Sequence, residues 1–322
     1  MAFLFAAGIT ALLVCASTAG AQEYTLPSPP DSVVGEVTMV KASAEDTLPD
    51  IARRYEVGYE GIRLANPGVD TWLPGKGTEV VVPSQFVLPD APHEGIVVNV
   101  PEMRLYYFPK PRAGESAKVF TYPISVGRGD WQTPLVVTKV IRKEKDPTWR
   151  PPESIRSEHA ARGDPLPKAV RPGPDNPLGE YALRLSVPGY LIHGTNKPYG
   201  IGMRVTHGCI RLYPEDINAL FHMVPVGTPV RIVNQPVKVG WLDHRLYMEV
   251  HPPFADTDSG KPLNLTPIVQ AVVNATGEPP SDKVVNWNAV YSAARLSTGI
   301  PMEVSRGAVA SARTGSALKN AD

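Results

Sequence analysis

The sequence predicts a mainly β fold with a small α+β domain on its amino-terminal side. The chain has 322 residues, enough for two domains. It contains 35 prolines, roughly twice the usual proportion, which disfavours a helical bundle and favours strands joined by stiff loops. Beyond residue 94, short runs of β-branched and aromatic residues recur, and one segment, about 214–224, has the apolar spacing of an amphipathic helix.

The charge balance gives no reason to expect nucleic acid or an anionic membrane as a partner. The chain has 32 Lys and Arg residues and 32 Asp and Glu residues, so its formal net charge is zero. Hydrophobic residues make up 43% of the sequence, which excludes wholesale disorder.

The amino terminus predicts export. Residues 2–14 are apolar and uncharged, but the run is shorter than the roughly 20 residues of a spanning helix. It is followed by Ala19, Gly20 and Ala21, the small-x-small pattern of a signal-peptidase site, although no Lys or Arg precedes it. We expect residues 1–21 to be a cleaved signal peptide, which leaves no membrane span in the mature form. An uncleaved anchor and lipoprotein processing at Cys15 are the alternatives.

Two segments precede the main domain. Residues 22–35 are rich in Pro and Ser and predict a flexible leader. Residues 36–84 predict a strand–helix–helix–strand unit, which contains in order the segments EVTMVKAS, DTLPDIARRY, YEGIRLAN and TEVVVP. This unit resembles a LysM module, except that Glu45 stands where the Gly-Asp-Thr-Leu turn of that family begins. The resemblance implies peptidoglycan binding, and a degenerate unit acting as a spacer is the alternative.

Residues 94–234 predict the mainly β domain, with its helix beginning at Pro214. Within it, residues 147–177 hold eight prolines in a segment too long for a simple connector, so we expect a lid over a site; a decorative insertion is the alternative. Residues 235–304 predict a carboxy-terminal extension with a strand and a helix. The Ala, Ser and Gly-rich segment 305–322 predicts a disordered tail.

The densest group of reactive side chains surrounds Cys209. The chain has two cysteines, and signal cleavage would leave this one alone. A thiol becomes a nucleophile when an imidazole takes its proton or a cation stabilises the thiolate. His207 and Arg211 lie two residues on either side, so in an extended segment all three would share one face. A glycine-rich turn could bring back His193, and Gly208 would leave room for a substrate carbonyl at an oxyanion hole.

A metal site or a purely structural role fits these residues less well. His193, His207 and Cys209 could be three zinc ligands, but no fourth soft ligand is nearby and the spacing fits no common zinc finger. A buried structural role could account for one histidine, but hardly for two together with the thiol and an arginine. We therefore predict no metal and no cofactor.

The segment from His193 to Arg211 resembles the YkuD-type catalytic domain of L,D-transpeptidases, whose motif is His, a spacer, and Ser/Thr-His-Gly-Cys followed by an apolar residue and Asn or Arg. The similarity extends over residues 95–241. It implies a β-sandwich or barrel-like catalytic domain in which Cys209 attacks the third residue of a peptidoglycan stem and expels the terminal D-alanine. The resemblance implies roles for the following residues: His193 as proton donor and acceptor, His207 as a supporting or alternative base, the Gly194 carbonyl as an orienting group, Gly208 beside the nucleophile, and Arg211, Thr206 and Thr195 in substrate binding.

The implied function is that of the periplasmic subgroup, whose partners are a tetrapeptide stem donor and an amine acceptor. The products would be 3–3 cross-links or an outer-membrane lipoprotein attached to peptidoglycan. A cell-wall thiol peptidase or amidase is one alternative, but such enzymes usually place Cys before His; a sortase-like enzyme usually has a longer His-to-Cys gap. A non-catalytic peptidoglycan-binding protein is the alternative from another class.

Overall fold

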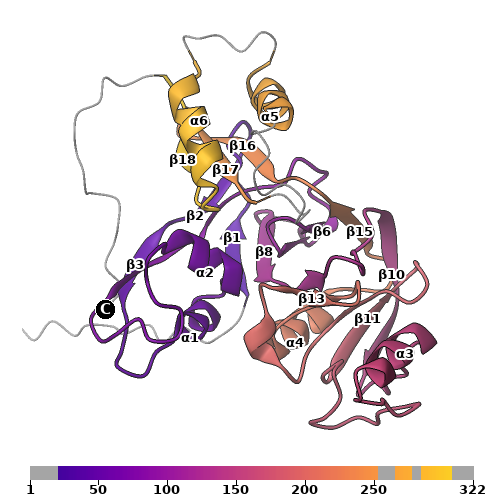
Figure 1. The fold of residues 1–322 in the computed structure, drawn as a ribbon. Coiled ribbons are helices and arrows are strands. Elements are labelled where there is room, and N and C mark those ends of the chain that lie inside the picture. Colours follow the sequence, from indigo (N-terminus) through magenta and orange to yellow (C-terminus); the bar gives the residue numbers. More distant parts are fainter. Residues whose placement is uncertain (1–20, 253–264, 278–283, 307–322) are drawn as a thin grey trace, which may run out of the picture.

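The computed structural model describes residues 21–252, 265–277 and 284–306, and its frame is one large sheet. The predicted mainly β class is confirmed (Figure 1). The nine strands lie, in spatial order, as β1 (Gln22–Thr25), β8 (Lys118–Pro123), β7 (Arg104–Phe108), β6 (Gly95–Asn99), β15 (Pro229–Val233), β10 (Val137–Lys145), β11 (Tyr181–Leu185), β12 (Leu191–His193) and β14 (Ile210–Arg211). Neighbours are antiparallel except in the pairs β6–β15 and β12–β14.

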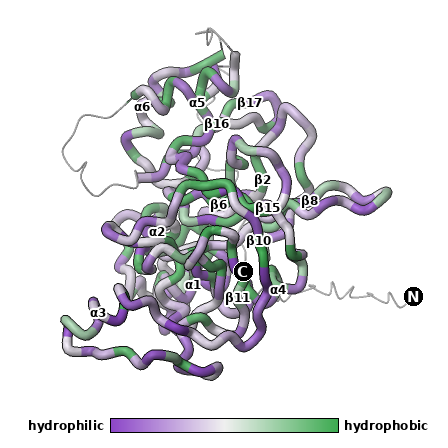
Figure 2. The backbone as a smooth tube through the Cα atoms, turned by 90° about the vertical axis from the view of Figure 1, so that its right-hand side faces the viewer, coloured by the Kyte–Doolittle hydropathy of each residue, from purple (hydrophilic) through white to green (hydrophobic). Residues whose placement is uncertain are grey.

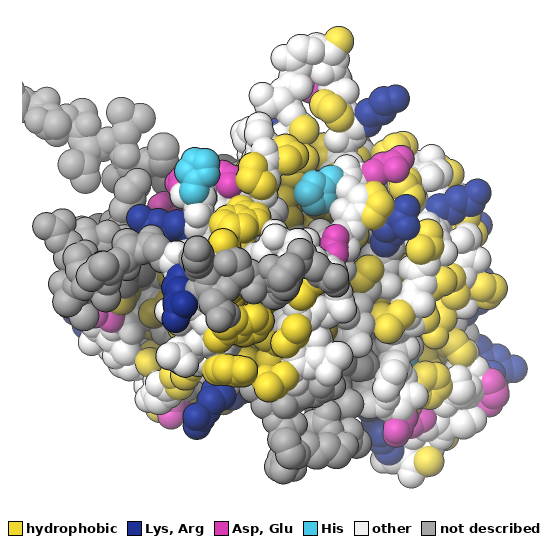
Figure 3. All heavy atoms as spheres, turned by 90° about the horizontal axis from the view of Figure 1, so that it is seen from above, with side chains coloured by type: hydrophobic (Ala, Val, Ile, Leu, Met, Phe, Trp, Pro, Cys, Tyr) yellow, Lys and Arg dark blue, Asp and Glu magenta, His cyan; other side chains and the backbone are white. Residues whose placement is uncertain are grey.

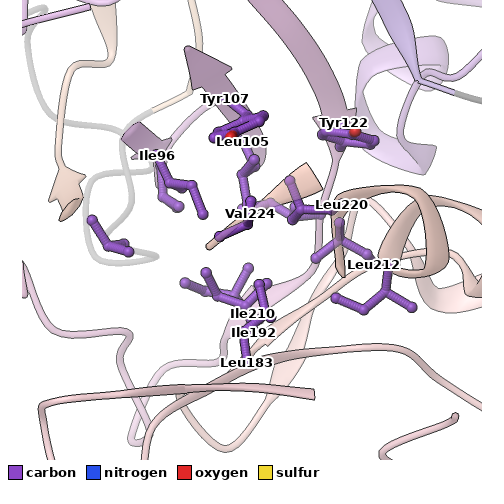
Figure 4. Close-up of a cluster of buried hydrophobic side chains, with 14 of the residues drawn as sticks. Ile96, Leu105, Tyr107, Tyr122, Leu183, Ile192, Ile210, Leu212, Leu220 and Val224 are labelled. Carbon is purple, nitrogen blue, oxygen red and sulfur yellow. The ribbon is translucent and has the colours of Figure 1, made fainter. Parts of the chain in front are cut away.

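The sheet curves around one apolar core. Side chains of β6 and β7, near one end of the sheet, share a cluster with side chains of β11, β12 and β14 at the other (Figure 4). Helix α4 (Pro214–Met223) contributes Leu220 to the same cluster, and Val224 follows it. Burying Ile192 and Ile210 on adjacent strands fixes the register of the two strands that carry the reactive residues.

The expectation of a flexible leader at residues 22–35 is wrong. Residues Gln22–Thr25 form β1, which pairs along its whole length with β8, and β2 (Val33–Gly35) pairs with β5 (Gln85–Val87). The sequence of β1 has little apolar pattern, but its backbone hydrogen bonds with β8, which would otherwise be the edge of the sheet, stabilise it as a strand. The predicted signal peptide, by contrast, lies outside the described residues apart from Ala21.

The strand–helix–helix–strand elements expected in residues 36–84 are present and are called the βααβ unit below. They are β3 (Thr38–Lys41), α1 (Leu48–Arg54), α2 (Tyr59–Ala65) and β4 (Glu79–Val82). Thr47 and Asp50 form a capping box at the start of α1, which satisfies two backbone donors of the helix. The unit has its own core, which includes Ile51, Ile62 and Val80. Its binding of glycan stays a prediction.

The βααβ unit is fixed to the main domain by several contacts. Arg53 of α1 forms a two-pronged ion pair with Glu215 of α4, at 2.7 and 2.9 Å. The Tyr59 amide donates to the Ile201 carbonyl at 3.0 Å, and Arg104 of β7 donates to the Glu56 carbonyl at 3.1 Å. The unit is therefore joined to the main domain by side chains and backbone together.

Two carboxyl groups are buried at this junction. No other described residue donates a hydrogen bond to the carboxyl oxygens of Glu56 or Asp216. The two carboxyl groups can bond to each other only when one of them is protonated. Burial raises the pKa of Glu56 to about 7, although Arg104 and Arg53 act against it. Burial and the neighbouring Glu56 raise the pKa of Asp216 well above its usual range. The pair therefore holds a proton at mildly acidic pH.

We expect Glu56→Gln to weaken the pH dependence of stability. A carboxyl group whose pKa rises on folding stabilises the folded state fully below its unfolded pKa of 4.5, and that stability is lost as the pH rises through about 7. The wild type should lose on the order of 2 kcal/mol of unfolding free energy in this interval. Urea unfolding at about pH 5 and pH 8 measures the slope. An equal slope in wild type, Glu56→Gln and the exposed control Glu45→Gln would contradict the assignment.

The carboxy-terminal extension is an ordered subdomain. It consists of β16 (Val237–Leu242), β17 (Arg245–Val250), β18 (Met302–Glu303), α5 (Thr266–Thr276) and α6 (Trp287–Leu296), which share a core of their own. On the face of the molecule that carries α5 and α6, the described Lys and Arg side chains lie interspersed with Asp and Glu side chains (Figure 3). Of the predicted tail, Ser305 and Arg306 are described, and Ser305 bridges to Val285; the rest lies outside the described residues.

The expected lid is not structureless. Residues Glu153–Ala161 form helix α3, and Trp149 pairs with Val170 across the segment. In two perpendicular views, α3 lies at the opposite end of the molecule from α5 and α6 (Figures 1 and 2). No helix within the described ranges has both the length and the apolar character of a membrane-spanning helix.

Candidate active site

A cavity of about 470 Å³ holds most of the residues predicted for the site. His193, His207, Cys209 and Arg211 all line it, together with Thr206. Thr195 does not line it: its side chain is buried and accepts a hydrogen bond from the Lys197 amide at 2.9 Å. Ile155 of α3 also lines the cavity, so the lid segment does lie against this site.

Two adjacent strands place His193 near Cys209. Strands β12 and β14 run parallel, with His193 opposite Arg211, and Cys209 comes directly before β14. The intervening residues turn back through the short helix η1 (Pro198–Gly200) and β13 (Arg204–Thr206), which pairs with β9 (Val126–Gly127). The glycine-rich segment thus folds back as the sequence predicted.

The ring of His193 has a defined tautomer. Its Nδ1 lies 2.6 Å from the Gly194 carbonyl oxygen, and a carbonyl can only accept, so Nδ1 carries the hydrogen. The Nε2 atom of the neutral ring is then free to accept a proton. Burial, reinforced by the charge of Arg211, lowers the pKa of His193 to about 3, while the backbone bond to Gly194 acts in the opposite direction. His193 is therefore a neutral base at physiological pH.

The thiol of Cys209 is also neutral at rest. Its side chain is partly buried, and Sγ lies 3.7 Å from the Gly189 carbonyl oxygen. Burial raises the pKa of the thiol, while Arg211 and Arg184 lower it without reversing the shift. The site thus holds a neutral thiol and a neutral imidazole, and proton transfer must accompany attack on the substrate.

The turn before Cys209 differs from the predicted extended segment. The chain bends at His207 and Gly208, and Gly208 has φ +97°, a conformation that side-chain-bearing residues rarely adopt. A Cβ atom at Gly208 would lie 2.9 Å from the Tyr190 ring. The Thr206 hydroxyl accepts from the Gly208 amide at 3.2 Å and donates to the Cys209 carbonyl at 2.6 Å. Thr206 therefore braces the turn, and the Gly208 amide is already bonded.

His207 contacts the lid helix. Its Nε2 lies 3.0 Å from the Glu158 carboxylate of α3, and its ring meets Trp131 edge to face at 5.1 Å. Burial lowers the pKa of His207, and the positive charge of Arg128 adds to this effect while Glu158 opposes it. Glu158, Trp131 and Arg128 carry no motif and lie 49 to 79 residues from His207 in sequence, so sequence reasoning missed them.

Three arginines line the cavity and give it positive charge: the exposed Arg150, and Arg184 and Arg211, which are more enclosed. Arg211 is largely buried, and its Nε has no hydrogen-bond partner among the described residues. Arg184 of β11 is held by Glu144 at 2.5 and 3.1 Å and also lines the cavity. Two fixed guanidinium groups beside an uncharged nucleophile suit a substrate that carries carboxylates.

A second cluster of ionisable groups lies away from this cavity. Glu102, Glu249 and His251 present oxygen and nitrogen atoms close enough to hold a metal ion. The ammonium group of Lys238 lies among them, 2.8 Å from Glu102 and 2.9 Å from Glu249. Because that ammonium already supplies the positive charge, we interpret the cluster as a structural ion network.

Comparisons with known proteins agree with this geometry. Residues 93–232 match the YkuD family, described as the L,D-transpeptidase catalytic domain. The chain is 44% identical over 297 residues to a protein of Escherichia coli (strain K12) named "Probable L,D-transpeptidase YbiS", covering 89% of this chain and 94% of that protein. It is 40% identical over 307 residues to "Probable L,D-transpeptidase ErfK/SrfK" of the same strain, with 92% and 95% coverage. The chain belongs to the L,D-transpeptidase family with a YkuD catalytic domain.

Proposed function

We propose that the protein transfers a peptidoglycan stem peptide from a D-alanine to a second amine through a thioester on Cys209. The observation that carries this proposal is the shared cavity of Cys209 and His193, in which the His193 tautomer leaves Nε2 free to accept the thiol proton. Family membership supports the reaction class.

The transfer proceeds in two half-reactions, acylation of Cys209 and aminolysis of the resulting thioester. In the first, the Cys209 sulfur bonds to the carbonyl carbon of the third stem residue while His193 takes the thiol proton. The bond to D-alanine breaks, and the proton passes to the departing amine. In the second, an acceptor amine attacks the thioester, gives a proton to His193 and forms a new amide, and the sulfur recovers its proton. The thioester conserves the acyl activation, so ATP is not required.

The arginines support binding of an anionic peptide. The donor ends in a carboxylate, and its third residue, diaminopimelate, carries another. We assign the recognition of these groups to Arg211 and Arg184, which line the cavity beside Cys209. Thr206 is assigned to bracing the turn because its hydroxyl is bonded on both sides.

The βααβ unit is proposed to hold the glycan strand. Trp72 and Leu73 are 57% and 80% exposed in the loop between α2 and β4, and the Trp72 ring lies 6.3 Å from that of Tyr59. Exposed aromatic rings give a sugar an apolar face to pack against. Because peptidoglycan lies in the periplasm, glycan binding by the βααβ unit implies that the mature protein acts in the periplasm.

Intact-protein mass spectrometry tests the proposal. The purified protein is mixed with a tetrapeptide donor and either a diaminopimelate-containing stem or a lipoprotein-like peptide with a free lysine. We expect a Cys209 adduct equal to the donor minus D-alanine, amide product with at least one acceptor, and neither with Cys209→Ala. Hydrolysis alone with both acceptors would favour a thiol peptidase. Binding to sacculi without any adduct would favour a non-catalytic protein.

A further inference from the structure

We propose that Glu158 is a positioning residue for acyl transfer: it fastens the lid helix α3 to the turn before Cys209 and selects one tautomer of His207. This inference rests on the proposed function and adds to it the device that holds the lid in place.

Glu158 lies at the centre of a small charged cluster. One carboxylate oxygen accepts a hydrogen bond from Arg128 and forms an ion pair at 2.6 Å with Arg162, which directly follows α3. The other oxygen lies 3.0 Å from Nε2 of His207. Arg162 beside α3, Arg128 after β9 and His207 in the turn before Cys209 therefore all contact the carboxylate of Glu158.

The donor pattern sets the proton on His207. A carboxylate can only accept, so its contact with Nε2 requires the hydrogen to be on Nε2. Arg128 lies 3.3 Å from the same Nε2. An arginine can only donate, and a protonated Nε2 cannot accept, so this contact is not a hydrogen bond in this tautomer. His207 is thus held with Nε2 protonated and Nδ1 bare, the opposite arrangement to His193.

The carboxylate stays charged across the working pH range. Its bond from Arg128, together with the one from His207, lowers the pKa of Glu158 to about 2 despite partial burial. Protonation therefore does not release the contact under ordinary conditions.

The rest of α3 has little else to hold it in place. Its one buried residue is Ile155, which lines the cavity; Glu153 is exposed and pairs with Arg156 on the same helix. A helix with so small an apolar face depends on specific contacts for its position. Glu158 joins α3 to the segments that form the cavity wall through its contacts with Arg128 and His207, and the ring of His159, on the same helix, lies 6.3 Å from the ring of His207.

Loss of the negative charge should therefore loosen the lid and leave the His207 tautomer unselected. Glutamine has the same shape, but it can donate to or accept from Nε2, so both tautomers are allowed. It also leaves Arg128 and Arg162 without their counter-charge beside the imidazole. Water should then reach the thioester more easily, which favours hydrolysis over aminolysis.

The test compares Glu158→Gln with the matched control Glu153→Gln on the same helix. The measured quantities are the rate of Cys209 acylation by the tetrapeptide donor, and the ratio of tripeptide to amide product at fixed acceptor concentration. We expect Glu158→Gln to slow turnover roughly 10- to 100-fold, as loss of an orienting partner usually does. We also expect a several-fold rise in the tripeptide share, while Glu153→Gln resembles the wild type.

Two further variants separate positioning from folding. Glu158→Asp keeps the charge and should recover part of the product ratio. If Glu158 acts through His207, the double variant Glu158→Gln with His207→Gln should be no slower than His207→Gln alone. An unchanged product ratio in Glu158→Gln, or fully additive losses in the double variant, would overturn the proposal. Failure of the wild type to form any Cys209 adduct would instead overturn the proposed function.

Discussion

Replacing His193 by glutamine is expected to slow acylation of Cys209 by roughly 10²- to 10⁴-fold, the usual contribution of a general base. Glutamine is close to histidine in length but cannot take up the thiol proton. The stopped-flow rate of acyl-enzyme formation, with the adduct confirmed by mass, measures the loss. The control is His222→Gln, because His222 is exposed on α4 and bonds to the Asn218 carbonyl.

The pH profile gives this prediction a second readout. His193 has a pKa of about 3 and is neutral above it, so wild-type kcat/KM should not fall with decreasing pH until near that value. In His193→Gln the thiol must ionise unaided, and burial raises its pKa. The residual rate should then rise about tenfold per pH unit at every pH below the raised pKa of the thiol. A pH-independent residual rate, or a larger loss in His207→Gln than in His193→Gln, would assign the base to His207.

Replacing Lys238 by methionine is expected to cost about 3 to 5 kcal/mol of unfolding free energy, the usual cost of breaking a buried ion pair. Lys238 is 3% exposed, and its ammonium contacts the Val87 carbonyl at 2.6 Å as well as Glu102 and Glu249. Its charge is the main influence that lowers the pKa of Glu102 against the effect of burial. Without the ammonium, two buried carboxylates lose their main counter-charge.

Chemical unfolding monitored by tryptophan fluorescence measures this cost. Arg245→Ala is the matched control on the same hairpin, because Arg245 forms an exposed pair with Glu303 and should change stability by less than about 1 kcal/mol. If Lys238→Met does not fold, Lys238→Met with Glu249→Gln should recover part of the stability. A loss no greater than that of Arg245→Ala would show that Lys238 does not hold the subdomain in place.

The sequence predicted well what depends on neighbouring residues. The reactive group from His193 to Arg211 spans one strand, a return segment and a second strand, so its chemistry was visible in one stretch of chain. The βααβ unit was predicted for the same reason: its apolar periodicity and its capping residues lie within one short stretch, residues 36–84.

The remaining features depend on distant partners. Helix α3 has one buried residue, so it has almost no apolar period to detect, and its position depends on Glu158 meeting His207, 49 residues away. Strand β1 is stabilised by pairing with β8, which lies far along the chain at residues 118–123. The bend at Gly208 is a matter of backbone angle, which a pattern of side chains on one face does not reveal.

The firm junction between the βααβ unit and the main domain has a consequence for where the enzyme acts on a polymer. If a flexible linker joined the βααβ unit to the main domain, the Cys209 thiol could reach many stem peptides around one bound sugar. Here the ion pair of Arg53 with Glu215 and the backbone bond from Tyr59 to Ile201 fix the separation between the exposed ring of Trp72 and the thiol of Cys209. If the unit grips glycan, the protein acts as a molecular ruler that selects stems at one set spacing and one side of the strand.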